Sequence, residues 1–298
     1  IVRAFNGPAL SALAPNLVPK TILPNAIALS SIAWQTGMIV GPAIGGYTHA
    51  IYPALPYAFA CVLFGVAITA LSFSGKVPQP PREANKRPIH QMVEGLRYVV
   101  HNKMVLGAIT LDLFAVFLAG ATALFPVFAR DILHVGPEGL GQMRAAPAVG
   151  AAIVAVMLSW RPLEREVGAK MLFAVAAYGA MTLAFGLSRH FLLSLGFLAL
   201  LGAADMVSVF IRSSLVQLNT PDDVRGRVSA ISGLAISASN ELGELQSGFA
   251  AALLGATGAV VFGGTGAIVV TILWAWLFPE IRRARTFAPQ YRLKESGS

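Results

Sequence analysis

Four carboxylates lie inside long apolar segments of the sequence: Asp112, Asp205, Glu241 and Glu244. An ionisable side chain in hydrocarbon is costly, so it usually faces a cavity, a partner or a substrate pathway. Partly desolvated carboxylates can carry protons or contact a substrate. Alternatively, each of them simply accepts hydrogen bonds from nearby backbone, Ser or Thr groups. Both interpretations stay open from the sequence.

Their positions along the predicted helices give these carboxylates a depth. At about 1.5 Å per residue, Asp112 lies about 12 Å and Asp205 about 10 Å from the same membrane face. Glu241 and Glu244 are three residues apart and share a helix face, about 20 Å and about 24 Å from that membrane face. Asp112 and Asp205 are therefore expected at similar depth, and the two glutamates farther across.

Two arginines are candidate ion-pair partners for these acids. Arg212 follows Asp205 by two helical turns, so it either pairs with Asp205 or anchors at the lipid headgroups. Arg144 lies about 8 Å from the opposite membrane face, near the level of Glu244. We hypothesise one polar network between Arg144 and Glu244 or Glu241. The alternative is a set of separate, hydrogen-bonded structural polar groups.

The composition is that of a polytopic membrane protein. Hydrophobic residues make up 56% and charged residues 12% of the 298-residue chain, and the mean hydropathy is +0.68. No soluble domain of this length is expected to have such a composition. The 22 Lys and Arg residues outnumber the 14 Asp and Glu residues, but they cluster between apolar runs. No nucleic-acid partner is therefore predicted.

We predict an all-α membrane protein with eight transmembrane helices. A transmembrane helix needs about 20 apolar residues. The apolar runs cover approximately residues 26–50, 55–74, 104–128, 139–159, 169–187, 191–212, 228–254 and 258–278. Basic residues concentrate at both ends of the chain and in alternate loops. The positive-inside rule then makes both ends cytoplasmic in a multi-pass protein of the cell membrane.

The first apolar run contains a glycine motif. Gly37, Gly41 and Gly45 are four residues apart, which makes a smooth helix face that another helix can approach closely. Pro42 removes a backbone donor and favours a bend, and Gly46 extends the motif. We expect this stretch to be a kinked, closely packed helix whose glycines lie in the outer half of the membrane.

The longest polar stretch, residues 75–103, separates two apolar runs from six. Its second half carries apolar residues three and four apart, which indicates an amphipathic helix at the membrane surface. The predicted domains are residues 1–74, the linker 75–103, the bundle 104–278 and a basic tail at 279–298.

The chain also contains a weak internal repeat. Residues 11–52 align without gaps on residues 213–254, which pairs Gly41 with Gly243 and Gly46 with Gly248. Glu244 then stands where Pro42 stands in the first copy. Parallel repeats are typical of transporters built from two six-helix halves. The alignment makes the eight helices equivalent to helices 5–12 of twelve, so we expect an N-terminally truncated chain.

Several motifs, in order and at family spacing, resemble the major facilitator superfamily, and the multidrug and siderophore exporters in particular. They are Arg3-Ala4-Phe5, Pro8-Ala9, Leu17-Val18-Pro19, Asn25-Ala26, the antiporter-like motif at 41–46, and the stretches 124–131, 141–147, 225–228 and 239–244. The resemblance implies that Asp112 and Asp205 stand on helices lining a central cavity. It also implies a cytoplasmic loop motif at Arg225, Gly226 and Arg227.

The resemblance implies secondary active transport by alternating access, with protons driving the export of small amphipathic molecules. Trp34, Gln35 and Asn240 are cavity candidates, although Trp34 also suits an ordinary packing role. An uptake permease, or a sensor or scaffold without transport, remains the alternative. Motifs of nucleotide-binding loops, metalloproteases and serine hydrolases are missing, and Cys61 is the single cysteine. We therefore expect no enzyme activity, cofactor or metal. We also expect a monomer, whose partners are the substrate, protons and the lipid bilayer.

Overall fold

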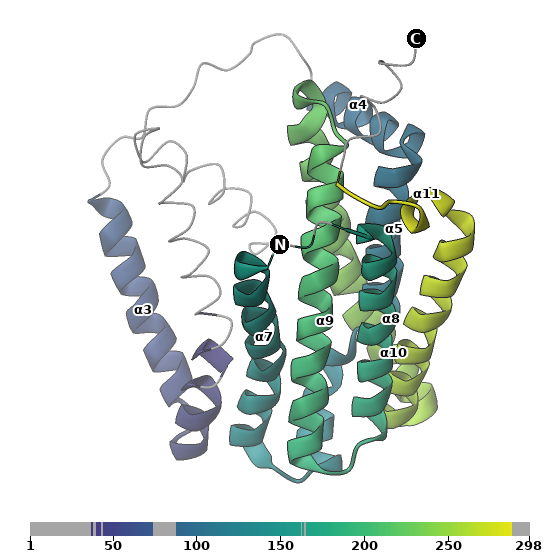
Figure 1. The fold of residues 1–298 in the computed structure, drawn as a ribbon. Helices are drawn as coiled ribbons and strands as arrows, with labels where there is room; N and C mark the ends of the chain where they lie inside the picture. Colours follow the sequence, from purple (N-terminus) through teal and green to yellow (C-terminus); the bar gives the residue numbers. More distant parts are fainter. Residues whose placement is uncertain are drawn as a thin grey trace, which may run out of the picture.

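The computed structural model describes residues 37, 40–42, 44–73, 88–161, 163 and 165–287. These residues form helices joined by short turns, without any strand, as Figure 1 shows. The part of the first apolar run that is described, residues 37, 40–42 and 44–50, is helical. It is followed by α3, Leu55–Ser72, which is exposed along most of its length.

The remaining helices form a bundle. They are α4 (Pro88–His101), α5 (Lys103–Leu118), η1 (Ala121–Leu124), α6 (Phe125–Val127), η2 (Phe128–Ile132), α7 (Gly136–Trp160), α8 (Val167–Leu187), α9 (Phe191–Leu218), α10 (Asp222–Leu277) and α11 (Pro279–Arg282). The elements α5 to η2 act as one long apolar segment, residues 103–132, because only Ala119 and Gly120 interrupt it.

The predicted count of eight transmembrane helices is not confirmed. Within the described residues, five helices are long and apolar enough to span a membrane, and Leu55–Ala70 is a shorter apolar helix. The fifth contains two of the predicted runs, because α10 has 56 residues and would be about 84 Å long if straight. Gly255 breaks it with φ 74° and ψ 165°, a conformation that glycine tolerates.

Both ends of α10 lie at the same end of the bundle. Its first turns contact α4, where Arg227 forms an ion pair with Glu94. Beyond its last turn, Ile281 of α11 contacts Gly107 of α5 and Gly168 of α8, near the start of each helix. The two arms of α10 therefore form a hairpin. We call this part of the bundle the basic end, because Lys103, Arg161, Lys170, Arg225, Arg227 and Arg282 gather there.

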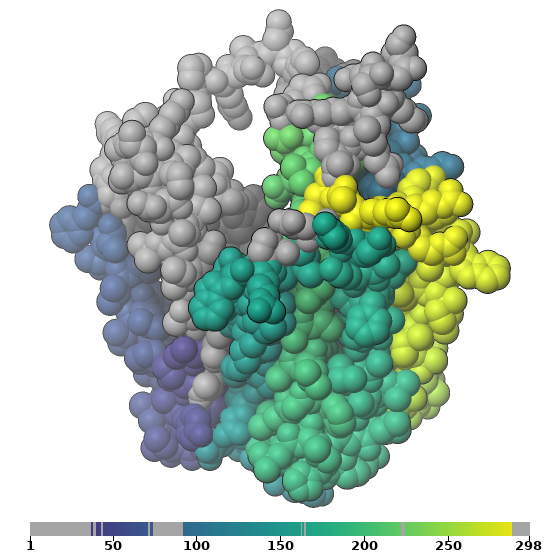
Figure 2. Space-filling view, in the orientation of Figure 1, coloured from purple at the N-terminus to yellow at the C-terminus, as the bar shows by residue number. Residues whose placement is uncertain are grey.

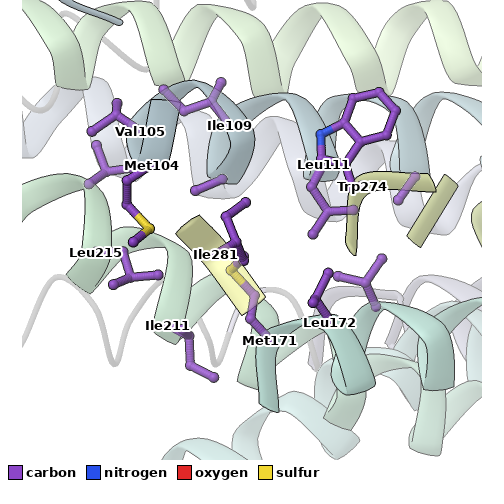
Figure 3. Packing of buried hydrophobic residues seen from close by; sticks show 14 of the residues in the cluster. Met104, Val105, Ile109, Leu111, Met171, Leu172, Ile211, Leu215, Trp274 and Ile281 are labelled. Carbon is purple, nitrogen blue, oxygen red and sulfur yellow. The ribbon is translucent and has the colours of Figure 1, made fainter. Parts of the chain in front are cut away.

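Two hydrophobic clusters hold the bundle together. The cluster nearer the basic end is built around residues such as Leu111, Met171, Ile211 and Trp274, and Figure 3 shows it closely packed. The second cluster surrounds Phe128 and Phe185, whose rings stack with their centroids 4.7 Å apart. Each end of the bundle thus has its own packed core.

Small residues allow α7 and α9 to cross in close contact. A Cβ atom on Gly150 would lie 1.8 Å from the carbonyl oxygen of Ala199, and one on Gly202 would lie 1.9 Å from that of Pro147. Such contacts are typical of membrane helices, which associate through close van der Waals packing. They fix α7 on α9 and thereby position Arg144, which α7 carries.

The amphipathic helix predicted in the linker is α4, and its neighbours fix it firmly. Gly95 lets α4 approach α10, since a Cβ there would lie 2.9 Å from the Cβ of Arg227. The Tyr98 hydroxyl donates a hydrogen bond of 2.6 Å to the carbonyl of Asn219 at the end of α9. Asn102 caps α5 by accepting a hydrogen bond from the amide of Val105. The linker helix is therefore part of the packed bundle.

Candidate functional site

A pocket of about 730 Å³ lies between the glycine motif and the start of α7. Both elements supply mainly backbone and small side chains to its wall. Its residues include Gly41, Pro42, Gly45, Gly46, His49, Tyr57, Pro126, Arg130, Leu140, Gly141 and Arg144. The wall is therefore largely apolar and carries two arginines. We call it the seam pocket, because it follows the contact between the glycine motif and α7.

The contact beside the seam pocket depends on two glycines. A Cβ atom on Gly46 would lie 2.9 Å from the Cα of Gly141, and one on Gly141 would lie 2.6 Å from the carbonyl oxygen of Pro42. The side-chain amide of Gln142 donates a hydrogen bond of 3.2 Å to the Tyr47 hydroxyl. A larger side chain at either glycine would push the two helices apart and open the seam.

In the part of the chain that the structure describes, Gly37, Gly41 and Gly45 do not make the predicted close helix contact. Among the described residues, no atom comes within 4 Å of a Cβ built on any of the three. Gly41 and Gly45 line the seam pocket instead. The close approach falls on Gly46, because one residue along a helix turns the side-chain direction by about 100°. The motif therefore serves two purposes, a pocket wall and a helix contact.

Arg144 and Glu244 are not paired in this structure. The exposed side chain of Arg144 lines the seam pocket, and no carboxylate of the described residues lies within ion-pair distance of it. Glu244 is also exposed and accepts a hydrogen bond of 3.5 Å from the Thr122 hydroxyl. Glu241 and Asn240 are exposed on the same arm of α10.

A second glycine contact explains the position of Glu244. A Cβ on Gly120 would lie 2.7 Å from the carbonyl carbon of Gly243, and one on Gly243 would lie 2.9 Å from the carbonyl oxygen of Val116. The first arm of α10 therefore packs closely against the end of α5. That contact brings Glu244 to Thr122, the second residue after the break in the α5 segment.

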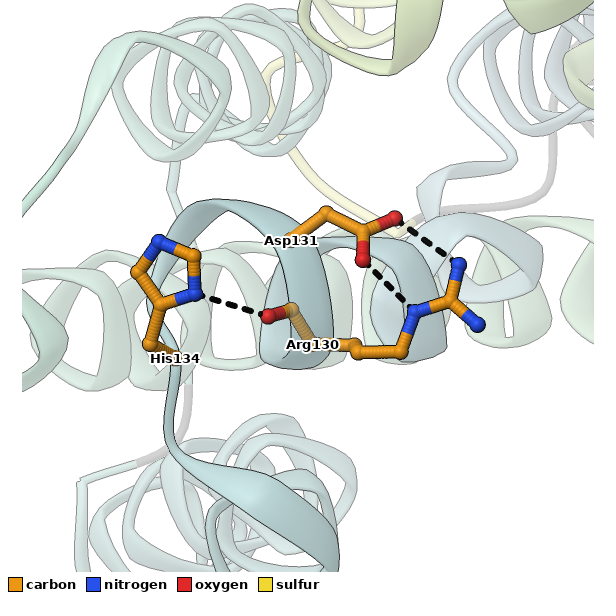
Figure 4. Close-up of polar contacts among 3 residues, drawn as sticks. All are labelled: Arg130, Asp131 and His134. Carbon is orange, nitrogen blue, oxygen red and sulfur yellow. Dashed lines mark hydrogen bonds and ion pairs between the residues drawn. The ribbon is translucent and has the colours of Figure 1, made fainter.

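The second arginine of the seam pocket has a partner in its own turn. Arg130 donates to Asp131 through Nε at 2.6 Å and through Nη2 at 3.0 Å, as Figure 4 shows. A ring nitrogen of His134 lies 2.9 Å from the carbonyl oxygen of Arg130. Asp131 thus balances the charge of Arg130. Arg144 is the other arginine of the seam pocket, and it has no neighbouring acid among the described residues. The sequence indicated Arg130 only as part of the motif at 124–131.

Among the described residues, the buried charged side chains are an ion pair between α5 and α9. Asp112 and Arg212 contact each other directly and are only 6% and 5% exposed. Arg212 therefore neither anchors at headgroups nor pairs with Asp205. Asp205, seven residues earlier on α9, is half-buried and has no ion pair or hydrogen bond among the residues that the structure describes. The two aspartates predicted at similar depth thus have different surroundings.

A family model described as transmembrane secretion effector, of the major facilitator superfamily, matches residues 1–294. The chain belongs to this major facilitator family. It is similar to the protein named enterobactin exporter EntS from Escherichia coli O1:K1 / APEC, with 27% identity over 297 residues. The enterobactin exporter EntS of Shigella boydii serotype 18 is 27% identical over 296 residues. Each alignment covers 97% of this chain and 69% of the relative.

The family confirms the resemblance inferred from the motifs. As a major facilitator protein, the chain is a multi-pass membrane protein of a transporter family, and its apolar helices agree with that assignment. The prediction of a membrane protein of the efflux transporter type is supported by the same match and by the exporter relatives.

The loop motif of this major facilitator protein has a local structural role in the described residues. Arg225 donates through Nε to the carbonyl of Gln217 at 3.1 Å and through Nη2 to that of Thr220 at 3.1 Å. Arg227 pairs with Glu94 on α4, whereas no atom of the described residues comes within 4 Å of a Cβ built on Gly226. Trp34 and Gln35, the other cavity candidates, lie outside the described residues.

Proposed function

We propose that the chain belongs to a secondary exporter that moves small amphipathic molecules across the cell membrane by alternating access. The membership in a major facilitator family and the similarity to proteins named as exporters support this function. The main structural support is the seam pocket. Its apolar wall and Arg144, which pairs with no described acid, suit an amphipathic molecule with a negative group.

The proposed organisation follows the two-half pattern. Residues 1–74 belong to one half and residues 104–278 to the other, with the linker at 75–103 and the tail at 279–298. We propose that both ends of the chain are cytoplasmic, because the basic residues of the bundle gather at one end. We further propose that the protein acts as a monomer, with substrate and protons as its partners.

The proposed proton carriers are Asp205, Glu241 and Glu244. These three carboxylates have no ion pair within the described part of the chain, so each can gain and lose a proton without breaking one. Asp112 differs, because its carboxylate contacts Arg212 and would have to leave that partner first. We therefore propose that Asp112 and Arg212 position α5 against α9, and that proton movement involves the unpaired acids.

Efflux in intact cells tests the proposed function. Expression of the complete gene should lower the accumulation of at least one fluorescent amphipathic dye severalfold, and a protonophore should abolish that difference. The control is a strain that carries the empty vector. If the dyes accumulate equally with and without the gene, the exporter proposal is wrong for them; if efflux persists with the protonophore, proton coupling is wrong.

Replacement of Arg144 by glutamine should lower the efflux of an anionic dye by about tenfold. The reason is that a hydrogen bond to a charged group contributes about 1.5–3 kcal/mol. Arg189→Gln is the matched control, because Arg189 is also exposed but lies outside the seam pocket. Initial efflux rates at matched expression measure both variants. Equal rates for Arg144→Gln and the unaltered protein would remove Arg144 from the substrate path.

A further inference from the structure

A second hollow, of about 720 Å³, lies on the other side of α7. It is formed by the end of α7, the start of α8 and the middle of α9, close to the basic end. Figure 1 shows α9 between these two helices, and Figure 2 shows the same face with its side chains. No residue of the seam pocket lines this hollow, which we call the α7–α8 groove.

The groove exists because α7 and α8 do not pack against each other. Helix α9 packs extensively on both of them, whereas no extensive contact joins α7 to α8. Four alanines, Ala174 and Ala177 of α8 with Ala203 and Ala204 of α9, leave the space between them unfilled. An apolar channel therefore runs along α9 between its two neighbours.

Large apolar side chains border the channel and remain exposed. Met157 is 60% exposed, Trp160 81% and Phe173 76%. Tryptophan is enriched where membrane meets water, so Trp160 marks the level of the interface at the end of α7. The groove thus extends from the interface into the hydrocarbon region, which is where a lipid chain lies.

Two cations stand where the groove reaches the interface. Arg161 follows the last residue of α7, and Lys170 lies in the first turn of α8. Within the described residues, neither has a carboxylate at ion-pair distance. Glu166, between them in sequence, pairs instead with Arg285 at 3.8 Å. No acid that the structure describes neutralises these two positive charges, so they can pair with a negative group.

We propose that the α7–α8 groove binds an anionic phospholipid. One acyl chain lies on the alanines of α8 and α9, and the phosphate lies between Arg161 and Lys170. Basic pockets between transmembrane helices are known to bind anionic headgroups, and the apolar length of the groove suits a chain. A purely cationic or neutral amphipathic molecule would leave both cations unpaired. This site is independent of the transport path through the seam.

Native mass spectrometry of the full-length, delipidated protein tests the site. The probes are phosphatidylglycerol and phosphatidylcholine with identical acyl chains. We expect the protein to prefer phosphatidylglycerol by about tenfold or more, since each basic residue near an anionic headgroup contributes about 1 kcal/mol. In the double variant Arg161→Gln/Lys170→Gln, the affinity for phosphatidylglycerol should fall to about the affinity for phosphatidylcholine.

Two matched controls separate this site from general charge or folding effects. Arg282→Gln/Arg283→Gln removes the same charge from exposed arginines near the same end and should keep the preference. Ala177→Leu fills the groove and should lower the binding of both lipids, whereas Ala169→Leu, on the exposed side of α8, should not.

Three outcomes would overturn the proposal. The first is an equal loss of the preference for phosphatidylglycerol in Arg161→Gln/Lys170→Gln and in Arg282→Gln/Arg283→Gln. The second is displacement of phosphatidylglycerol by its glycerophosphoglycerol headgroup alone, which would mean that the groove holds no chain. The third is displacement by a transported dye, with the same dependence on Ala177, which would assign the groove to substrate. Thermal unfolding of each variant, compared with the unaltered protein, shows that the fold persists.

Discussion

Replacement of Arg212 by glutamine is expected to destabilise the helical bundle by about 3–5 kcal/mol. Asp112 would then keep a charge in a site that is only 6% exposed, without its partner. Removing one member of a buried pair is costly for that reason, whereas replacing both by apolar residues is often neutral. The double variant Asp112→Leu/Arg212→Met should therefore recover much of the stability that Arg212→Gln loses. Unfolding of the purified protein in detergent measures both.

Asp205→Asn is the matched control for this prediction. Asp205 lies on the same helix as Arg212 but has no ion pair in the described residues, so its amide should change stability by less than about 1 kcal/mol. The Asp205→Asn variant should instead lower proton-coupled transport. Equal destabilisation by Arg212→Gln and Asp205→Asn would show that the Asp112–Arg212 pair has no special structural role.

Replacement of Gly46 by leucine is expected to reduce transport by about tenfold or more, because overpacking a helix contact costs about 1–3 kcal/mol. A Cβ at this position already lies 2.9 Å from the Cα of Gly141, so the larger side chain must separate the glycine motif from α7. Gly141→Leu should have the same effect from the other side. Efflux at matched membrane expression measures the loss.

Gly65→Leu is the control for the glycine contact. No described atom lies within 4 Å of a Cβ at Gly65 on α3, so leucine there should leave efflux within about twofold. Gly45→Leu should narrow the seam pocket without separating the helices, and it should affect large substrates more than small ones. If Gly46→Leu transports normally, the seam contact does not limit the transport cycle.

Much of the fold could be predicted from the sequence, because membrane helices need long apolar runs that composition reveals directly. Residues 139–159 and 169–187, for example, were expected to be helical and lie within α7 and α8. The amphipathic helix before Lys103 was also predicted from its spacing and is α4. The break at Gly255 agrees with the two apolar runs that flank it.

The pairing of charges could not be predicted, because it depends on how the helices are rotated against each other. Asp112 and Arg212 are a hundred positions apart, and the spacing along one helix offered Arg212 either Asp205 or the lipid headgroups. The same limit applies to the glycine motif. Its spacing indicated a smooth face, but only the packing against Gly141 shows that Gly46 makes the contact.

The attachment of α4 to the bundle has a mechanical consequence for the two halves that we propose. The Tyr98 hydroxyl holds the end of α9, Arg227 of α10 pairs with Glu94, and Asn102 joins α4 to α5 with a single intervening residue. Helix α4 is therefore attached to α5, α9 and α10 by side-chain contacts as well as by the chain. If the two proposed halves rock against each other, these contacts would transmit force on α4 directly into α5, α9 and α10.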